Sequence, residues 1–548
     1  MLPRRTLLEW GGAAFWTPAA SRVEPAIPSR AFDAREHGAR GDGKTKDTGA
    51  IQKTIDAAFQ AGGGVAYVPP GTYLTGGLEI RSRVRLHLEA GATLRGSTDL
   101  SDYQPHDGPP AGSDANQKHL IYARNADDIA ITGQGVIDGQ GPSFWAPSGR
   151  PAPKPEDLWR DVATYDWKKL ARPSPMVELV ECRNVRMEGV TLANSPGWTL
   201  RPIACDSVFI RGIRIRNPIY GPNTDGIDPT CCQNVFIADC DIATGDDTIC
   251  LKSENPYGGP VRVSKNITIA NCVLTSCCNG FKMGTATRGG FENIAFTNSV
   301  VYNNDVPLNQ RVIAGIAVEM VDGGWVDGVV ISNIRMQNVR TPIFVRLGSR
   351  HGAGRLRGVM ISNVHATGAI LTSSITGVPG HAVEDVTLDN IRIDTVEGGK
   401  AEWAALNVPE KIESYPEARM FGRLPSYGIY CRHAAGLRLR NVQVNARVAD
   451  PRPLLACDQV EDLDADALNG TAPGAGQPLV QLTNVQRAFF RGSRAPADTS
   501  LYARVSGAQS AGISILGNDL SHAAQIVETT DGAPTGAVFA SGNHTAKG

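Results

Sequence analysis

The chain has 548 residues, of which 41% are hydrophobic and 20% are charged. This composition excludes an intrinsically disordered polymer, because it supplies enough apolar surface for a large folded core. The 54 Lys and Arg residues balance 55 Asp and Glu residues, so no net field draws the protein to nucleic acid or to a membrane surface. Sixty glycines and only 6% aromatic residues favour a turn-rich β architecture over a helical bundle.

The N-terminal residues 1–25 predict an export signal. Arg4 and Arg5 precede a short apolar stretch that ends near the small residues Ala19 and Ala20. Paired arginines are typical of twin-arginine export, but Glu9 interrupts the apolar stretch, so the export route stays open. No later stretch is apolar enough to span a membrane. We therefore expect an exported protein, either periplasmic or extracellular.

A capping helix is predicted close to the start of the folded chain. Asp47 and Thr48 can cap the N-terminus of a helix in which Ile51, Ile55 and Phe59 share one face, and glycines 62–64 end it. Such a helix suits the end of a solenoid, where the terminal coil would otherwise expose its core and a strand edge.

A short sequence repeat runs along most of the chain. It consists of a polar residue or glycine, a V-x-I strand and then a second apolar strand. The spacing, mostly about 23 to 35 residues, fits one turn of a solenoid in which each coil buries its apolar face against its neighbours. We predict an all-β, right-handed parallel β-helix over residues 26–445, with further coils or a small β module over 446–548. Its repeat cores are Asn184-Val185, Ser207-Val208, Asn234-Val235, Asn266-Ile267, Asn293-Ile294, Gly328-Val329, Gly358-Val359, Asp385-Val386 and Gly436-Leu437.

Long polar segments interrupt the predicted coils at about 101–117, 142–172 and 398–427. The eleven cysteines include no C-x-x-C pair, which argues against a zinc site. The favoured interpretation is small residues stacked in the core, and one or two disulfides remain the alternative in an exported protein.

Two acidic clusters stand one coil apart. The first is Asn223-Thr224-Asp225-Gly226-Ile227-Asp228, and the second is Gly245-Asp246-Asp247-Thr248. Neighbouring coils of a β-helix lie about 5 Å apart, so these carboxylates should gather in one patch. Like charges so close together are destabilising, and either cluster alone could simply be Asn, Asp and Gly residues that form a turn. Two such clusters in register, however, favour a catalytic site.

With these residues, the chain resembles glycoside hydrolase family 28, the polygalacturonases and rhamnogalacturonan hydrolases. The motifs that carry the resemblance are Gly38-Ala39-x-Gly41-Asp42-Gly43, Asp47-Thr48-x-Ala50-Ile51-Gln52, Pro69-x-Gly71-x-Tyr73, Asn194-Ser195-Pro196, Asn223-Thr224-Asp225-Gly226 and Gly245-Asp246-Asp247.

The resemblance implies an inverting hydrolase of pectin-type polysaccharides that needs neither a cofactor nor a metal. By position, Asp246 resembles the general acid, and Asp225 with Asp247 resembles the pair that activates water. Inversion normally requires the acid and base carboxyl groups to be about 6.5 to 9.5 Å apart. Crowding should also raise the pKa of one carboxyl group and keep it protonated near neutral pH.

Two departures from the family pattern bear on specificity. Asn279 stands where polygalacturonases carry a histidine, so any proton-tuning role is lost or passes to Lys282. Ala317 and Glu319 stand where the family has an Arg-x-Lys pair that grips the substrate carboxylate. We therefore expect a neutral sugar, such as rhamnose, beside Glu319, and we expect plain polygalacturonan to be a poor substrate.

Other residues are candidates for substrate contact. Asn223 belongs to the first acidic motif, and Arg346 or Arg432 can supply the positive charge that the missing pair would have carried. Arg350 is a further candidate cation. Four aromatic residues can stack on sugars or pack on the solenoid wall: Trp198, Tyr220, Tyr427 and Tyr430. The long loops predict a cleft closed at one end, which favours removal of terminal sugars.

Two other functions fit the same fold. A polysaccharide lyase would need a base and usually calcium or an arginine, and no lyase motif is evident. A non-catalytic carbohydrate-binding solenoid is favoured by the altered histidine and Arg-x-Lys positions. The expected partner in every case is a pectic oligo- or polysaccharide, and not nucleic acid or a membrane.

Overall fold

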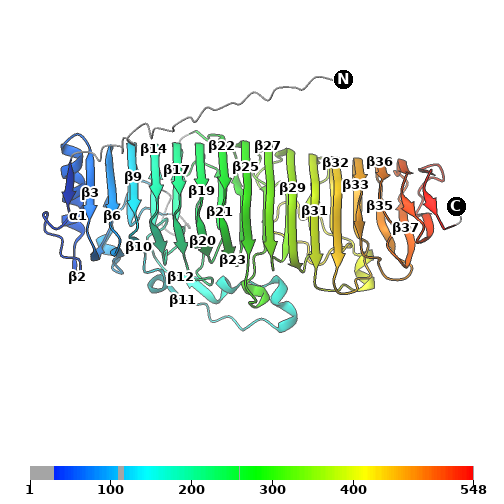
Figure 1. Cartoon of the computed structure of the whole chain (residues 1–548), viewed down its shortest axis with the longest axis horizontal. Helices are drawn as coiled ribbons and strands as arrows, with labels where there is room; N and C mark the ends of the chain where they lie inside the picture. Colours follow the sequence, from blue (N-terminus) through cyan, green and yellow to red (C-terminus); the bar gives the residue numbers. More distant parts are fainter. Residues whose placement is uncertain (1–29, 109–115, 258–259, 547–548) are drawn as a thin grey trace, which may run out of the picture.

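The computed structural model describes residues 30–108, 116–257 and 260–546, so the predicted export signal lies outside the described residues. Figure 1 shows one long row of strands, capped at the blue end by a helix. The strands stack in parallel from coil to coil and form three faces of a right-handed β-helix, as the repeat predicted. In the described part of the chain, no helix is long and apolar enough to cross a bilayer.

The first face carries the acidic clusters. Its strands are β5 (Leu78–Glu79), β8 (Ile121–Arg124), β13 (Val177–Val180), β16 (Leu200–Ile203), β21 (Ile249–Ser253), β24 (Asn279–Thr287), β26 (Ala314–Met320), β28 (Thr341–Leu347), β30 (Ser373–Thr376), the start of β32 (Ile429–Ala446) and of β33 (Leu455–Asp466), β35 (Pro478–Thr483), β37 (Thr499–Ser506) and β40 (Ala523–Thr530). Isolated bridges at Ile227 and Thr230 carry the face across the coil between β16 and β21.

The second face contains the V-x-I repeat. Its strands are β1 (Ala31–Asp33), β3 (Gly64–Val68), β6 (Val84–Leu88), β9 (Asp127–Gly133), β14 (Arg183–Glu188), β17 (Asp206–Arg211), β19 (Gln233–Ala238), β22 (Ser264–Ala270), β25 (Gly290–Tyr302), β27 (Trp325–Gln337), β29 (Arg355–Ala369), β31 (Val383–Thr395), parts of β32 and β33, β36 (Gln486–Arg491), β38 (Ala511–Leu516) and β41 (Val538–Ser541). Repeat positions stack in register, for example Val208 on Val235 and Val235 on Ile267, and these side chains are buried. Each such side chain contributes about 1.5 to 3 kcal/mol by burial.

The third face is made of shorter strands and of the far ends of the long ones. It contains β2 (Asp42–Lys46), β4 (Gly71–Thr75), β7 (Ala92–Gly96), β10 (Val136–Asp138), β15 (Thr191–Ala193), β18 (Arg214–Arg216), β20 (Asp241–Thr244), β23 (Val273–Ser276), the ends of β25, β27, β29, β31 and β32, and β34 (Asn469–Gly470). A short pair, β39 (Asp519–Leu520) and β42 (His544–Thr545), follows near the C-terminus.

Asparagine at the corners explains how the chain turns between faces. Asn266, Asn333 and Asn363 all adopt positive φ angles, which Asn tolerates better than most residues. Side-chain amides also form two ladders from coil to coil. Before the repeat strands Asn266 Nδ2 donates to Asn234 Oδ1 at 3.0 Å, and after them Asn363 Nδ2 donates to Asn333 Oδ1 at 2.9 Å. Asparagine therefore has a structural role at both ends of the repeat strands.

The capping helix α1 spans Thr48–Gln60 with Asp47 at its N-cap position, as predicted, but the predicted side-chain cap and the predicted burial of Phe59 are wrong. The Asp47 carboxylate makes no capping hydrogen bond to the helix; it accepts hydrogen bonds from the backbone N–H groups of Arg40 (2.8 Å) and Gly41 (3.0 Å). Ile51 and Ile55 are buried, but Phe59 is 40% exposed and Ala58 is buried in its place. The buried side of the helix is therefore the i, i+3, i+4, i+7 stripe of Ile51, Thr54, Ile55 and Ala58.

All eleven cysteines are free thiols, and only Cys278 is partly exposed. Several stack on one another between coils, as Cys431 does on Cys457. Seven of them fill the core as small side chains, the interpretation favoured from the sequence, whereas Cys231, Cys250, Cys277 and Cys278 lie outside the core cluster.

The long insertions contain little regular structure. The first has η1 (Leu100–Asp102). The second has the hairpin β11 (Trp145–Pro147) and β12 (Trp167–Lys169) with η2 (Gly141–Phe144), η3 (Pro155–Arg160) and η4 (Ala163–Asp166), and later insertions have η5 (Leu308–Gln310) and η6 (Ala401–Ala405). The segment with β11 and β12 and the yellow segment near residue 400 project from the lower edge of the row of strands (Figure 1). Beyond residue 445, the strands from β33 on continue the parallel pairing of the earlier coils.

Candidate active site

The two acidic motifs are held together by a close contact between neighbouring coils. Thr224 Oγ1 donates to Gly221 O at 2.9 Å and accepts from the backbone N–H of Gly245 at 3.0 Å. A Cβ atom at Gly226 would lie 2.3 Å from Thr248 O, and one at Gly245 would lie 2.3 Å from Gly221 O. Only glycine fits at these two points, so the motif glycines set the distance between the carboxylates. Asn223 is half-buried and adopts the left-handed conformation (φ 53°) just before this contact.

Asp225 and Asp228 share one lysine. Lys252 Nζ lies 2.7 Å from Asp228 Oδ1 and 3.7 Å from Asp225 Oδ2. All three side chains are buried, and Asp225 Oδ1 accepts no hydrogen bond from the residues that the structure describes. Burial and the nearby Asp246 raise the pKa of Asp225 well above its usual range.

Asp247 has an ordered partner on each oxygen. Asn279 Nδ2 donates to Oδ1 at 2.7 Å, and Lys282 Nζ lies 3.0 Å from Oδ2. Asn279, which stands at the position of the family histidine, thus uses its side-chain amide to hydrogen-bond the Asp247 carboxylate. The neighbouring Asp246 is less buried, and its Oδ1 accepts the backbone N–H of Asp247 at 2.9 Å.

Different environments shift the pKa values of the adjacent Asp246 and Asp247 in opposite directions. Burial, followed by repulsion from Asp247, raises the pKa of Asp246 to about 7. Burial alone would also raise the pKa of Asp247, but Lys282 and Lys252 outweigh it and lower that pKa below its usual value. Near neutral pH the site therefore offers a protonated carboxyl group beside an ionised one, the pair that general acid and base catalysis requires.

The closest ligand atoms of Asp246, Asp247 and Cys278 all lie within 4.8 Å of one another. The shortest oxygen to oxygen approach of the two aspartates is therefore smaller than the separation of about 6.5 to 9.5 Å expected for inversion. The adjacency of the two residues in the sequence explains the short distance. The stereochemistry must thus be tested on the product, because this spacing alone does not favour inversion.

Lys282 and Glu319 form a second buried pair. Lys282 Nζ lies 3.6 Å from Glu319 Oε2, and it donates to the hydroxyl of Tyr415 at 3.2 Å. Glu319 is completely buried, and within the described chain neither of its carboxylate oxygens accepts a hydrogen bond. Burial raises the pKa of Glu319 to about 8, although Lys282 opposes the shift. Glu319 is thus neither a surface carboxylate nor a group in direct reach of a sugar.

Arg346 and Arg432 are engaged elsewhere. Arg346 is buried, and it donates to the backbone oxygens of Gly377 (2.8 Å), Glu410 (2.8 Å) and Lys411 (3.1 Å). Arg432 pairs with Glu410 and, at 3.1 Å, with Asp458. These contacts attach the loop 398–427 to the solenoid, so the structure does not bring either arginine to the aspartates.

The four aromatic candidates for sugar contact lie in different environments. Tyr427 and Tyr430 are buried and pack on the solenoid wall, whereas Trp198 lies 4.6 Å from Lys252 Nζ (Nζ to ring centroid) beside the first acidic motif. Tyr220 is 38% exposed, and its ring centroid lies 5.3 Å from that of Trp167 in the loop with β12.

Covering segments close the first face on the C-terminal side of the aspartates. The outward residues there, which include Ala317, Phe344 and Tyr430, form an apolar cluster with residues of the loops 142–172 and 398–427. Arg419 from the second loop donates to Arg160 O of the first at 2.5 Å. Arg340 on the solenoid donates to Asp161 O at 2.7 Å.

The N-terminal side of the face is covered as well. His106 stacks on Tyr122 with ring centroids 3.7 Å apart, and Tyr257 donates its hydroxyl proton to Glu178 at 2.7 Å. Glu178 in turn pairs with Arg201, one coil before Asp228. The aspartates therefore lie on the part of the first face between two covered stretches, which we call the gap; Asp246 is partly exposed there, whereas Asp225 and Asp247 are buried.

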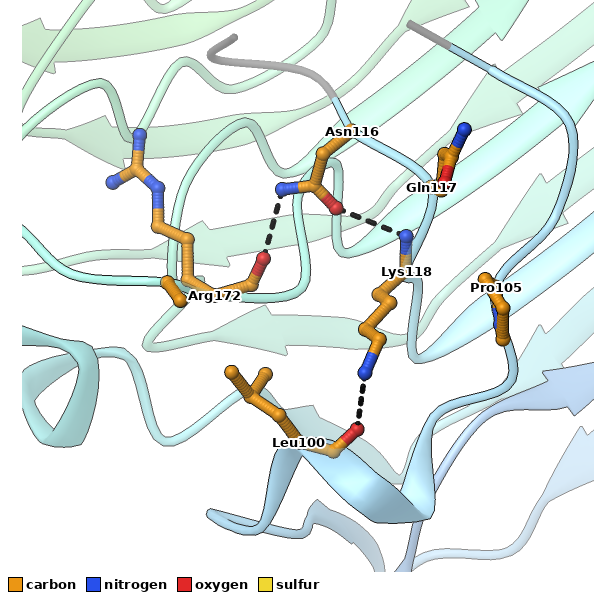
Figure 2. Close-up of a pocket in the computed structure, with 7 residues that line it drawn as sticks. Leu100, Pro105, Asn116, Gln117, Lys118 and Arg172 are labelled. Carbon is orange, nitrogen blue, oxygen red and sulfur yellow. Dashed lines mark hydrogen bonds between the residues drawn. The ribbon is translucent and has the colours of Figure 1, made fainter. Parts of the chain in front are cut away.

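A separate cavity of about 240 Å³ lies beside this gap and contains none of the aspartates. Figure 2 shows that Asn116 connects its two sides, because its side chain donates to Arg172 O and accepts from the backbone N–H of Lys118. Arg172 also donates to Pro222 O at 2.8 Å, directly before Asn223. Arg172, which lines the cavity, therefore supports the turn that carries the first acidic motif.

The sequence matches the family model described as Glycosyl hydrolases family 28 over residues 66–414, a span that contains both acidic motifs. The chain belongs to glycosyl hydrolases family 28. A second model, described as Rhamnogalacturonase A/epimerase, pectate lyase-like, matches residues 31–99 only. This family 28 protein is accordingly a glycoside hydrolase, which decides against the lyase alternative.

Named relatives agree with this membership. A probable polygalacturonase of Vitis vinifera is 28% identical over 442 residues, which cover 74% of this chain and 84% of the relative. An endo-polygalacturonase of Pectobacterium parmentieri is 29% identical over 61% of this chain and 78% of its own. The crystal structure of an exopolygalacturonase from Thermotoga maritima superposes with a TM-score of 0.56 and 27% identity, covering 68% of this family 28 chain and 88% of that one.

Two residues of the site, Lys252 and Tyr415, were not among the candidates predicted from the sequence. Lys252 was detectable in principle. It lies one coil after the Asp225 motif, and its side chain points to the same outer face of the strand as that of Cys250, two residues earlier. Tyr415 gave no such signal, since it lies in an irregular loop and contacts Lys282, which is 133 residues away in the sequence.

Proposed function

We propose that this protein removes terminal residues from galacturonate-containing pectic oligosaccharides by single-displacement, inverting hydrolysis. The observation that carries the proposal is the gap that exposes Asp246 beside the ionised Asp247 between two covered stretches of the first face. The polygalacturonase names of its relatives support a pectic substrate, but they include both exo- and endo-acting enzymes.

In this proposal Asp246 donates a proton to the departing glycosidic oxygen, which its raised pKa allows. Asp247 is the base, because its lowered pKa keeps it ionised when water must be deprotonated. Asp225, buried and open on one oxygen, orients that water. Lys252 and Lys282 compensate the negative charge as the proton moves.

Terminal action follows from the covering segments. Loops 142–172 and 398–427 close the C-terminal side, and His106 with Tyr257 covers the N-terminal side. A long polymer could not continue along the face in both directions from the aspartates, whereas a chain end could enter the gap.

The cleaved sugar is proposed to be neutral, as in a rhamnogalacturonan. Glu319 does not select this sugar by direct contact, because its side chain is buried and its pKa is raised. The support for a neutral sugar is that Ala317 supplies no cation and that the ammonium group of its register neighbour Lys282 is already paired with Asp247. A carboxylate on the cleaved sugar would therefore find no unpaired charge there.

Export to the periplasm or the extracellular space completes the proposal. It is supported by the arginine pair and apolar stretch of residues 1–25 and by the polymeric nature of pectic substrates.

Mass spectrometry of timed digests tests this function. We expect loss of a single terminal rhamnose from rhamnogalacturonan oligosaccharides that end in rhamnose, and slower cleavage of homogalacturonan oligosaccharides of equal length. Early appearance of mid-chain fragments would contradict terminal action, and faster cleavage of homogalacturonan would contradict the neutral-sugar argument. Binding without any product would favour the non-catalytic solenoid.

A further inference from the structure

One cation at the rim of the gap has no role so far. Arg350 follows the end of β28, and its side chain is about a quarter exposed. The other cations near the aspartates are committed: Lys252 and Lys282 pair with buried carboxylates, and Arg346 binds backbone oxygens. A uronate residue next to the cleaved sugar would still need a positive partner.

Arg350 is held rigidly by Asp322. Its Nε donates to Asp322 Oδ1 at 2.9 Å and its Nη2 donates to Oδ2 at 2.8 Å, while its backbone N–H donates to Val321 O at 2.7 Å. Asp322 is buried and also contacts His351 Nδ1 at 2.8 Å. Asp322 thus binds one edge of the guanidinium group, and Nη2 also donates to Thr285 O at 3.5 Å. Nη1 donates to nothing among residues 30–108, 116–257 and 260–546.

Tyr415 connects Arg350 to the aspartates. Its ring centroid lies 5.8 Å from Arg350 Cζ and 5.5 Å from Lys282 Nζ, and Lys282 is bound to Asp247. The Tyr415 side chain is 54% exposed although its hydroxyl is fixed by Lys282, so the ring offers an open surface.

The loop under Tyr415 is positioned from the same strand end. Ser349 N–H donates to Ile412 O at 2.9 Å, and Arg346 holds the oxygens of Glu410 and Lys411. Arg350 and Tyr415 are therefore fixed relative to each other. The acidic groups that act on Arg350 are Asp322 and Glu254, and Glu254 Oε1 lies 3.8 Å from Arg288 Nε.

We propose that Arg350 and Tyr415 form a subsite for a uronate residue that adjoins the cleaved sugar. The sugar ring lies against Tyr415, and its carboxylate accepts hydrogen bonds from Nη1 of Arg350, the guanidinium nitrogen that the protein leaves available. Asp322 is a positioning residue for Arg350. This inference rests on the proposed function, because it assumes a galacturonate-containing substrate.

Steady-state kinetics of Arg350→Gln on matched oligosaccharides, with galacturonate carboxyl groups either free or methyl-esterified, tests the subsite. We expect KM for the free acid to rise about 10- to 100-fold, as loss of one charged hydrogen-bond partner implies, with kcat changed less than about 3-fold. On the ester, wild type and variant should be equal. Arg350→Lys should recover part of the loss, and the exposed Arg440→Gln should behave as wild type.

An unchanged KM on the free acid would overturn the subsite, and an equal rise on acid and ester would show a role unrelated to the carboxylate. If the wild type cleaves neither substrate, the proposed function fails instead. Calorimetric binding of the free-acid oligosaccharide to the Asp246→Asn protein, with and without Arg350→Gln, then tests the subsite alone: equal affinities would overturn it, and weaker binding with Arg350→Gln would support it.

Discussion

Replacing Asp246 with asparagine should lower kcat by about 10²- to 10⁴-fold, the usual contribution of a general acid. Asp246 is the least buried of the three central aspartates, and asparagine has nearly the same size, so the fold should be retained. Steady-state kinetics together with thermal unfolding measure both quantities. Turnover close to that of the wild type in a folded Asp246→Asn protein would remove Asp246 from the mechanism.

The same assignment fixes the direction of the pH dependence in the wild type. A group with a raised pKa of about 7 is protonated below that pH and loses its proton as the pH rises through it. The rate should therefore be high below pH 7 and fall above it. This basic limb should be absent from the residual activity of Asp246→Asn.

The second large effect is expected for Lys282→Met. Lys282 is buried between Asp247 and Glu319, and removing one partner of a buried ion pair typically costs about 3 to 5 kcal/mol of stability. Asp247 would also lose the main cause of its lowered pKa, so its ionised form should become scarcer and kcat/KM should fall at least about 10-fold at pH 5 to 6.

Denaturant unfolding and a pH profile of kcat/KM provide the measurement for Lys282→Met. The exposed Lys44→Met is the matched control and should leave both unchanged. Lys282→Arg keeps the charge and should recover part of the stability. If Lys282→Met has the stability of the wild type and the same kcat/KM at pH 5 to 6, then Lys282 has no effect on Asp247.

Much of the architecture was predictable because it is local and repeated. The V-x-I repeat fixes both the strand and the coil, and the glycines at 226 and 245 bring two aspartate motifs into register. The partners of Asp47, Arg346 and Arg432 were not predictable, because each binds a group from another coil or an irregular loop.

The burial of Glu319 illustrates the same limit. An alternating strand pattern puts its side chain on the outer face, and only the loop contacts of Tyr415 and Lys282 show that this position is covered. Such contacts span more than a hundred residues, so neither periodicity nor motif spacing carries them. The sequence therefore predicts the acid and base residues better than it predicts the substrate subsites.

Proton NMR of a digest during the first minutes tests the central claim most directly, because it reads the configuration of the reducing end before mutarotation. Single displacement by water, with Asp246 as acid and Asp247 as base, predicts that the newly formed end first appears with the opposite anomeric configuration to the cleaved bond. A first product with retained configuration would contradict the account, since it would require a covalent intermediate on one of the aspartates.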